Sequence, residues 1–173
     1  MAKKSNNNTV KLLIMVCELV LAVVAFILLF ATPSVVYTYK GALTGTTKTN
    51  VSGVVGMFGG TDAEYAAPWA GMVSFILMAC GLVILVLLCC LSLAKKKFAL
   101  AGICKFVAAG LLIVAGVLVF FEVAAWTAAN GNASFAIGTY ASGSYSLGAG
   151  WLIAGIVSIC AGGLSCAEAF LTK

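Results

Sequence analysis

Four apolar stretches, each about 20 residues or longer, limit what this chain can fold into. We place them at residues 11–31, 68–93, 98–126 and 147–171. Of the 173 residues, 63% are hydrophobic and 9% are charged, whereas a soluble domain is usually about half apolar and a quarter charged. The first stretch is longer than the core of a signal peptide, so we interpret it as a retained span. The sequence therefore predicts an all-α membrane protein, a bundle of four transmembrane helices that forms a single domain over residues 1–173.

The lysines are distributed unevenly between the two sides of the predicted bundle. Most of them precede the first span, fill the short turn at residues 94–97, or end the chain, while the loops on the other side hold only Lys40 and Lys48. Cytoplasmic segments carry the excess of positive charge in membrane proteins. We therefore predict that the protein spans the plasma membrane, with both termini and the 94–97 turn on the cytoplasmic side. The tryptophans and tyrosines all fall near the opposite side, and we expect them at the outer interface.

Two outer loops, residues 32–67 and 127–146, have the composition of β-structure. Val, Thr and Tyr residues on either side of Gly45 predict a hairpin in the first loop. The segment ASFAIGTYAS in the second loop is expected to add a strand, which would give a small extracellular β-cap. Asn50 and Asn132 each begin an Asn-x-Ser sequence, so both are possible glycosylation sites if the host is eukaryotic.

Apart from Lys11 at the start of the first span, four charged residues lie inside predicted spans, where charge is costly. Glu18 and Lys105 each lie about two helical turns from the cytoplasmic end of a span, among small residues that suit a helix interface. A lone charge at mid-span costs about 2.5–3.5 kcal/mol on insertion scales. We therefore predict an intramembrane ion pair between Glu18 and Lys105. Glu122 is expected to be a buried acid near the outer side, satisfied by a Tyr hydroxyl or by Lys40 or Lys48. Glu168 is expected to reach water or a lysine of the 94–97 turn.

The fourth span carries small residues at intervals of four, an arrangement that allows the backbones of two helices to approach closely. This helix-packing stripe consists of Gly150, Ala154, Ser158 and Gly162. It predicts contact either within one bundle or between two copies of the chain. The seven cysteines all lie within predicted spans, so the outer loops offer no disulfide framework.

Several classes of function are disfavoured by the composition. The chain has no His and no Arg, and its motifs include neither a phosphate-binding loop nor a nucleophile elbow, so we expect no enzymatic activity. Without His and without paired cysteines, we expect no metal and no cofactor. The positive charge comes entirely from lysines between apolar runs, so nucleic acid is not an expected partner.

The chain looks like four-span proteins of low-GC Gram-positive bacteria, because its outer loop is rich in Gly, Thr and Ser and its final span opens with Leu-Gly-Ala-Gly. The threading of the chain also resembles that of claudin-like and MARVEL-like four-span proteins. The shared features are cytoplasmic termini, a long first outer loop, a short inner turn and a smaller second outer loop. The claudin signature of the first loop, a Trp with Gly-Leu-Trp and two cysteines, is absent. The resemblance implies an outer sheet on a four-helix bundle and no particular site residues.

Two functions remain open from the sequence. The first is a non-enzymatic membrane protein, a scaffold, accessory subunit or self-assembling four-span protein. Its partners would be the lipid bilayer and either another membrane protein or a second copy of the chain. The alternative is a channel or transporter subunit with a polar path past Glu18, Lys105 and Glu122. The first is favoured, because apolar residues separate Lys105 from Glu122.

Overall fold

The computed structural model of the chain describes residues 2–60, 65–94, 100–138 and 140–171. Four long helices form its main body, namely α1 (Ala2–Ala31), α3 (Trp69–Leu93), α4 (Ala101–Val119) and α6 (Ala149–Leu171). Each contains a run that is long and apolar enough to cross a membrane: Val10–Ala31, Trp69–Leu93, Ala101–Val119 and Ala149–Phe170. The prediction of four long apolar helices is confirmed.

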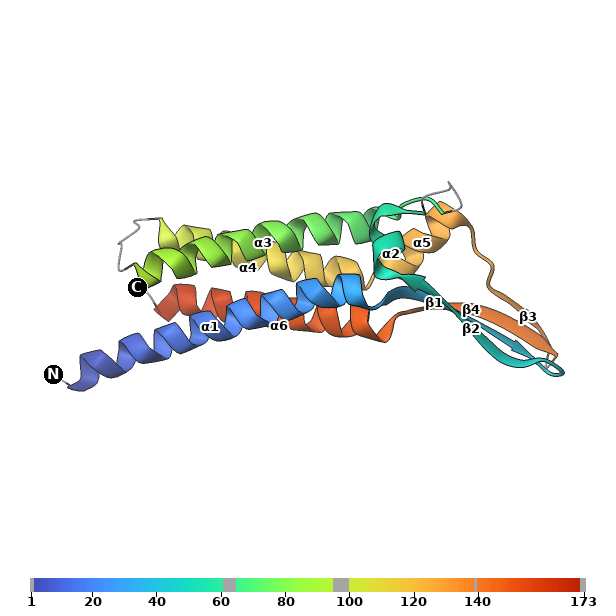
Figure 1. Cartoon of the computed structure of the whole chain (residues 1–173), viewed down its shortest axis with the longest axis horizontal. Helices are drawn as coiled ribbons and strands as arrows, with labels where there is room; N and C mark the ends of the chain where they lie inside the picture. The colour runs from blue at the N-terminus through green and yellow to red at the C-terminus, as the bar shows by residue number, and fades with distance from the viewer. Residues whose placement is uncertain (1, 61–64, 95–99, 139, 172–173) are drawn as a thin grey trace.

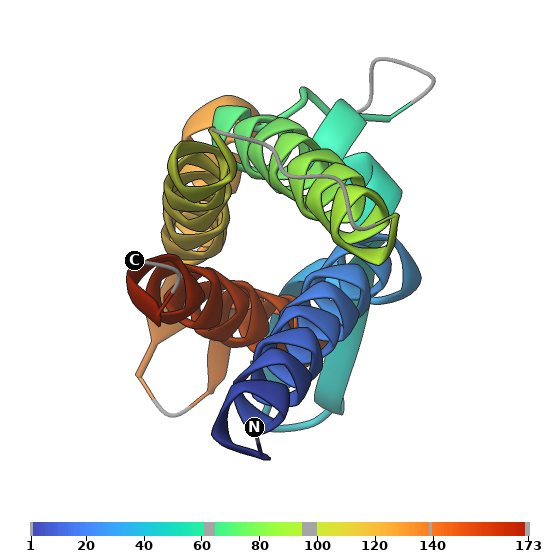
Figure 2. The ribbon, with the colours of Figure 1, turned by 90° about the vertical axis from the view of Figure 1, so that its left-hand side faces the viewer.

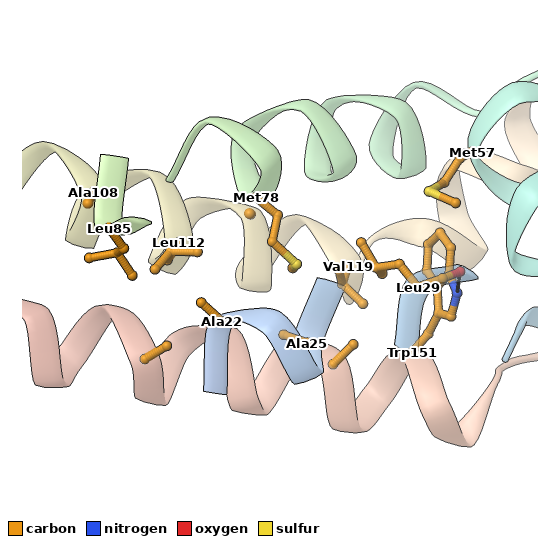
Figure 3. Close-up of a cluster of buried hydrophobic side chains, with 13 residues drawn as sticks. Ala22, Ala25, Leu29, Met57, Met78, Leu85, Ala108, Leu112, Val119 and Trp151 are labelled. Carbon is orange, nitrogen blue, oxygen red and sulfur yellow. Dashed lines mark hydrogen bonds between the residues drawn. The ribbon is translucent and has the colours of Figure 1, made fainter. Parts of the chain in front are cut away.

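The four helices surround a common interior. Helix α6 packs against both α1 and α4, and α3 completes the ring through its contact with α4 (Figure 2). Six of the thirteen residues in the buried apolar cluster are alanines, and the others are larger side chains such as Leu29, Met78 and Leu112 (Figure 3). Small residues let the helices approach closely, and the larger ones occupy the space that remains.

A four-stranded antiparallel sheet projects from one end of the bundle, opposite the end at which α1 begins (Figure 1). Its strands are β1 (Pro33–Gly41), β2 (Gly45–Ser52), β3 (Phe135–Ile137) and β4 (Ala141–Leu147), in the order β2-β1-β4-β3. The hairpin predicted around Gly45 is confirmed, and Gly45 has the positive φ of 74° that the turn requires. The strands of the second loop extend this hairpin, as expected, through pairing of β4 with β1.

Two short helices join the sheet to the bundle. Helix α2 (Gly53–Phe58) begins at an N-cap in which the hydroxyl of Ser52 accepts a hydrogen bond from the backbone of Val55. Helix α5 (Glu122–Asn130) follows α4 and ends at Asn130, whose side chain hydrogen-bonds to both backbone groups of Ala66. The junction between bundle and sheet is therefore built by α2, α5 and the start of α3.

The third apolar stretch, predicted as one span over residues 98–126, is two helices. At Phe120 and Phe121 the backbone N–H groups bond to carbonyls three residues back, which tightens the turn and ends α4 at Val119. Neither Pro nor Gly marks this break in the sequence. The 19 residues of α4 extend about 28 Å, close to the thickness of a bilayer core, so Glu122 lies just beyond the candidate span.

The tryptophans differ in their exposure, which their sequence positions did not predict. Trp69 is half-exposed, but Trp126 and Trp151 are buried inside the protein. The indole N–H of Trp151 donates to the carbonyl of Leu29 at 3.0 Å, linking α6 to the end of α1. Trp126 packs against Tyr65 instead. Buried indoles favour sites where their N–H finds a partner, and the helix end at Leu29 provides one.

Candidate functional site

A cluster of three charged side chains lies inside the bundle, at the end away from the sheet. Lys105 of α4 forms an ion pair with Glu168 of α6. Glu18 of α1 lies beside both groups and hydrogen-bonds through its side chain to Glu168 and Ser165. All three charged residues are buried, with Glu18 only 1% exposed. We call Glu18, Lys105 and Glu168 the charged cluster.

The charged cluster corrects the predicted pairing. The sequence paired Lys105 with Glu18 and expected Glu168 to reach water or an inner lysine. In the structure the ion-pair partner of Lys105 is Glu168, and Glu168 is buried. The reason is helix order, since α4 and α6 pack together along their lengths and bring their side chains into direct contact.

Two serine hydroxyl groups of α6 donate hydrogen bonds to backbone carbonyls of α4. Ser165 donates to the carbonyl of Lys105 at 3.3 Å, and Ser158 donates to the carbonyl of Leu112 at 2.8 Å. These bonds tie the two helices together at two levels. A buried hydroxyl that finds a carbonyl across a helix interface is worth about 0.6 kcal/mol on average.

An apolar row separates the charged cluster from the other buried acid. Ala108, Leu112, Ala115 and Val119 of α4 are all buried and lie between Lys105 and Glu122 along the helix. At 1.5 Å per residue, the 17 positions from Lys105 to Glu122 correspond to about 25 Å along the helix direction. None of the four side chains can relay a proton or bind an ion, so these residues do not connect the two sites by themselves.

Glu122 is fully buried at the junction of bundle and sheet. Its carboxyl group lies against two glycines, Gly56 of α2 and Gly71 of α3. A Cβ atom added to Gly71 would come within 3.0 Å of one carboxyl oxygen, and one added to Gly56 within 3.3 Å. The two glycines therefore make room for the acid, which packs where α2, α3 and α5 meet.

Neither oxygen of the Glu122 carboxyl has a hydrogen bond of ordinary geometry, although the backbone of Gly71 is close enough to favour the charged form slightly. The sequence expected Lys40, Lys48 or a Tyr hydroxyl to satisfy this acid. Both lysines are exposed on the sheet instead. Burial without a partner cation raises the pKa of Glu122 from 4.5 to about 8. The group therefore holds a proton at neutral pH.

The small residues of the fourth span face two neighbours. A Cβ atom at Gly162 would lie 2.8 Å from the carbonyl of Ala109 in α4, and one at Gly150 would meet the side chain of Thr32 at the end of α1. Ala154 and Ser158 are fully buried between these contacts. The helix-packing stripe is thus used within one copy of the chain.

The asparagines of both Asn-x-Ser sequences are exposed. Asn50 lies on the exposed edge strand β2, and the side chain of exposed Asn132 accepts a hydrogen bond from the backbone of Ser134. All seven cysteines are free thiols, and none is buried. In the described part of the chain, no group of three or more His, Cys, Asp or Glu residues is placed to hold a metal ion.

Within the described residues, the buried charged side chains belong to the charged cluster and Glu122, and both lie at contacts between helices. Their chemistry is that of ion pairing and proton binding. In comparisons with known proteins, no family model matches the chain and no curated protein matches its sequence. The resemblance to claudin-like and MARVEL-like proteins stays a prediction from the order of the elements.

Proposed function

We propose that the chain is a non-enzymatic, multi-pass protein of the plasma membrane that acts by binding another membrane protein or a second copy of itself. Its termini lie in the cytoplasm and its sheet lies outside. Four helices of spanning length support the membrane assignment. The lysine distribution supports the orientation, because the lysine-rich stretches of the sequence adjoin the start of α1 and the end of α3, which lie at the end of the bundle away from the sheet (Figure 1).

The apolar row of α4 is the observation that favours a binding role over a transport role. It places four buried apolar side chains between the charged cluster and Glu122. The charged cluster itself bridges α1, α4 and α6, as a structural ion pair would. Binding is then the task of the exposed surfaces, which are the outer sides of the helices and the projecting sheet.

Transport is the second candidate, and one observation favours it. The Oε2 atom of Glu18 and both carboxyl oxygens of Glu122 are buried without a hydrogen-bond partner. Buried acids of this kind in membrane proteins often mark a path for protons or ions. A path here would need water to enter the bundle and bridge about 25 Å.

The orientation is tested with epitope tags in intact cells. A tag inserted after Leu43, in the turn between β1 and β2, should bind antibody added outside, whereas tags at either terminus should bind only after permeabilisation. The turn is exposed and tolerates insertion better than a strand. Antibody binding to a terminal tag in unpermeabilised cells would contradict the proposed orientation.

The function is tested by purification and by flux. We expect a second protein or a second copy to remain bound in mild detergent at fixed stoichiometry. Liposomes holding the purified chain should pass protons and monovalent cations no faster than empty liposomes. A flux that the chain produces and that Glu18→Gln abolishes would reverse the order of the two candidates, with Gly110→Ala, a change in open space on α4, as the matched control.

A further inference from the structure

The outer end of the sheet carries large apolar side chains that nothing in the described chain covers. Leu43 is fully exposed, Tyr140 is 74% exposed and Ile137 is 62% exposed, while Phe135 is about two-fifths exposed. The backbone N–H of Ala42 donates to the carbonyl of Tyr140 at 2.8 Å, which holds the two turns of the sheet together. We call Leu43, Phe135, Ile137 and Tyr140 the distal patch.

The register of the strands shows that the sheet has two different faces. Tyr39 pairs with Gly143, which pairs with Phe135, and Ile137 pairs with Ala141, so these side chains share one face. The ring of Tyr39 lies 6.1 Å from that of Phe135. This face carries no charged residue among those described. An antiparallel sheet with one apolar face normally packs that face against something.

The opposite face is polar and positive. Lys40 alternates with Tyr39 along β1, and Lys48 pairs with Thr38, so both lysines lie on the face opposite Phe135 and Ile137. An acidic partner would therefore fit the lysine face better than the apolar face. Two copies of the apolar face can meet without bringing like charges together.

The orientation of the sheet would allow contact with a partner that lies beside it in the same membrane. The strands continue along the long axis of the bundle, so the two faces of the sheet look sideways rather than toward the helices (Figure 1). A two-fold axis along the bundle would place the apolar faces of two neighbouring copies against each other. We propose that the distal patch is a self-association surface that joins the sheets of two copies side by side in one membrane.

The expected size of this contact makes it weak in solution. Four strands spaced about 4.8 Å apart, with lengths of 9, 8, 3 and 7 residues, give a footprint of roughly 400 Å² per copy. A stable interface between soluble proteins covers about 800 Å² per partner. The contact therefore depends on the helices, which keep both copies in one plane with their sheets on the same side. The inference rests on the proposed function, because it names the partner of the binding surface.

The test measures energy transfer between two fluorophore-labelled populations of the full chain, reconstituted together in liposomes that contain no other protein. Ile137→Asp places a charge in the distal patch, and Thr46→Asp places the same charge on the lysine face as the matched control. Since both positions are exposed, thermal unfolding in detergent should match wild type. We expect Ile137→Asp to weaken association about tenfold and Thr46→Asp to leave it within twofold.

Equal loss in both variants, or no transfer with the wild-type chain, would overturn the self-association surface. Failure of the self-association surface can be distinguished from failure of the proposed binding role. If copies do not associate but a second protein copurifies from cells, the binding role stands and the partner named here is wrong. If the copies associate through the patch but the liposomes conduct ions in a Glu18-dependent way, the surface stands and the binding role falls.

Discussion

Replacing Glu122 by Gln is the sharpest test of the buried acid at the junction of bundle and sheet. The folded protein holds the proton of this carboxyl up to a pKa of about 8, whereas an unfolded chain releases it near 4.5. Between these values the unfolded state binds fewer protons than the folded state, so stability falls as pH rises. The stabilising contribution is complete below pH 4.5 and is lost by about pH 8.

The size of the effect follows from the gap between the two pKa values. A unit difference corresponds to about 1.4 kcal/mol, so the gap amounts to about 5 kcal/mol. For a chain of this length that is about 10–20 °C in melting temperature. Gln has the shape of Glu and cannot ionise. We therefore expect Glu122→Gln to remove most of this pH dependence and to melt above wild type at pH 9.

The assay is thermal unfolding in detergent, followed by tryptophan fluorescence, which the buried Trp126 and Trp151 should report. Wild type and Glu122→Gln are measured from pH 5 to pH 9 at one heating rate. Subtracting the two curves cancels every other titrating group and leaves the contribution of Glu122. A difference curve that is flat between pH 5 and pH 8 would refute the burial of an unpaired acid at this junction.

Two further predictions concern the helix bundle. Lys105→Met leaves the acids of the charged cluster without their cation and should lower the free energy of unfolding by about 3–5 kcal/mol. In a double-mutant cycle of melting temperatures, adding Glu168→Gln should recover much of that loss. Equal melting temperatures for wild type and Lys105→Met would contradict the ion pair. Gly116→Ala should destabilise by about 1–3 kcal/mol, because its new Cβ would lie 2.6 Å from the carbonyl of Gly155, while Gly110→Ala, with open space around it, should be neutral or slightly stabilising. If the two alanine variants melt alike, α4 and α6 do not approach at Gly116.

The charged cluster shows where prediction from this sequence reached its limit. Small residues around Glu18 and Lys105 correctly indicated that both side chains are buried. The choice of partner for Lys105 failed, because Glu18 and Glu168 lie at a similar depth and nothing local distinguishes them. Helices that are apolar on nearly all sides also give little sign of which neighbour each face meets.

Length and local composition are enough to predict several features of this protein. The four apolar helices follow from runs of about 20 apolar residues, and the hairpin follows from β-branched residues on either side of Gly45. Such properties need no knowledge of distant residues, because each segment must satisfy its own backbone hydrogen bonds or turn geometry.

The way these segments meet depends on contacts between distant residues, which form only in the folded chain. The order of helices around the bundle paired Lys105 with Glu168, and the break after Val119 moved Glu122 into a junction without a cation. The register of β3 and β4 gathered the distal patch onto one end of the sheet. These outcomes depend on contacts between residues up to about a hundred positions apart, which compete with many alternatives of similar local energy.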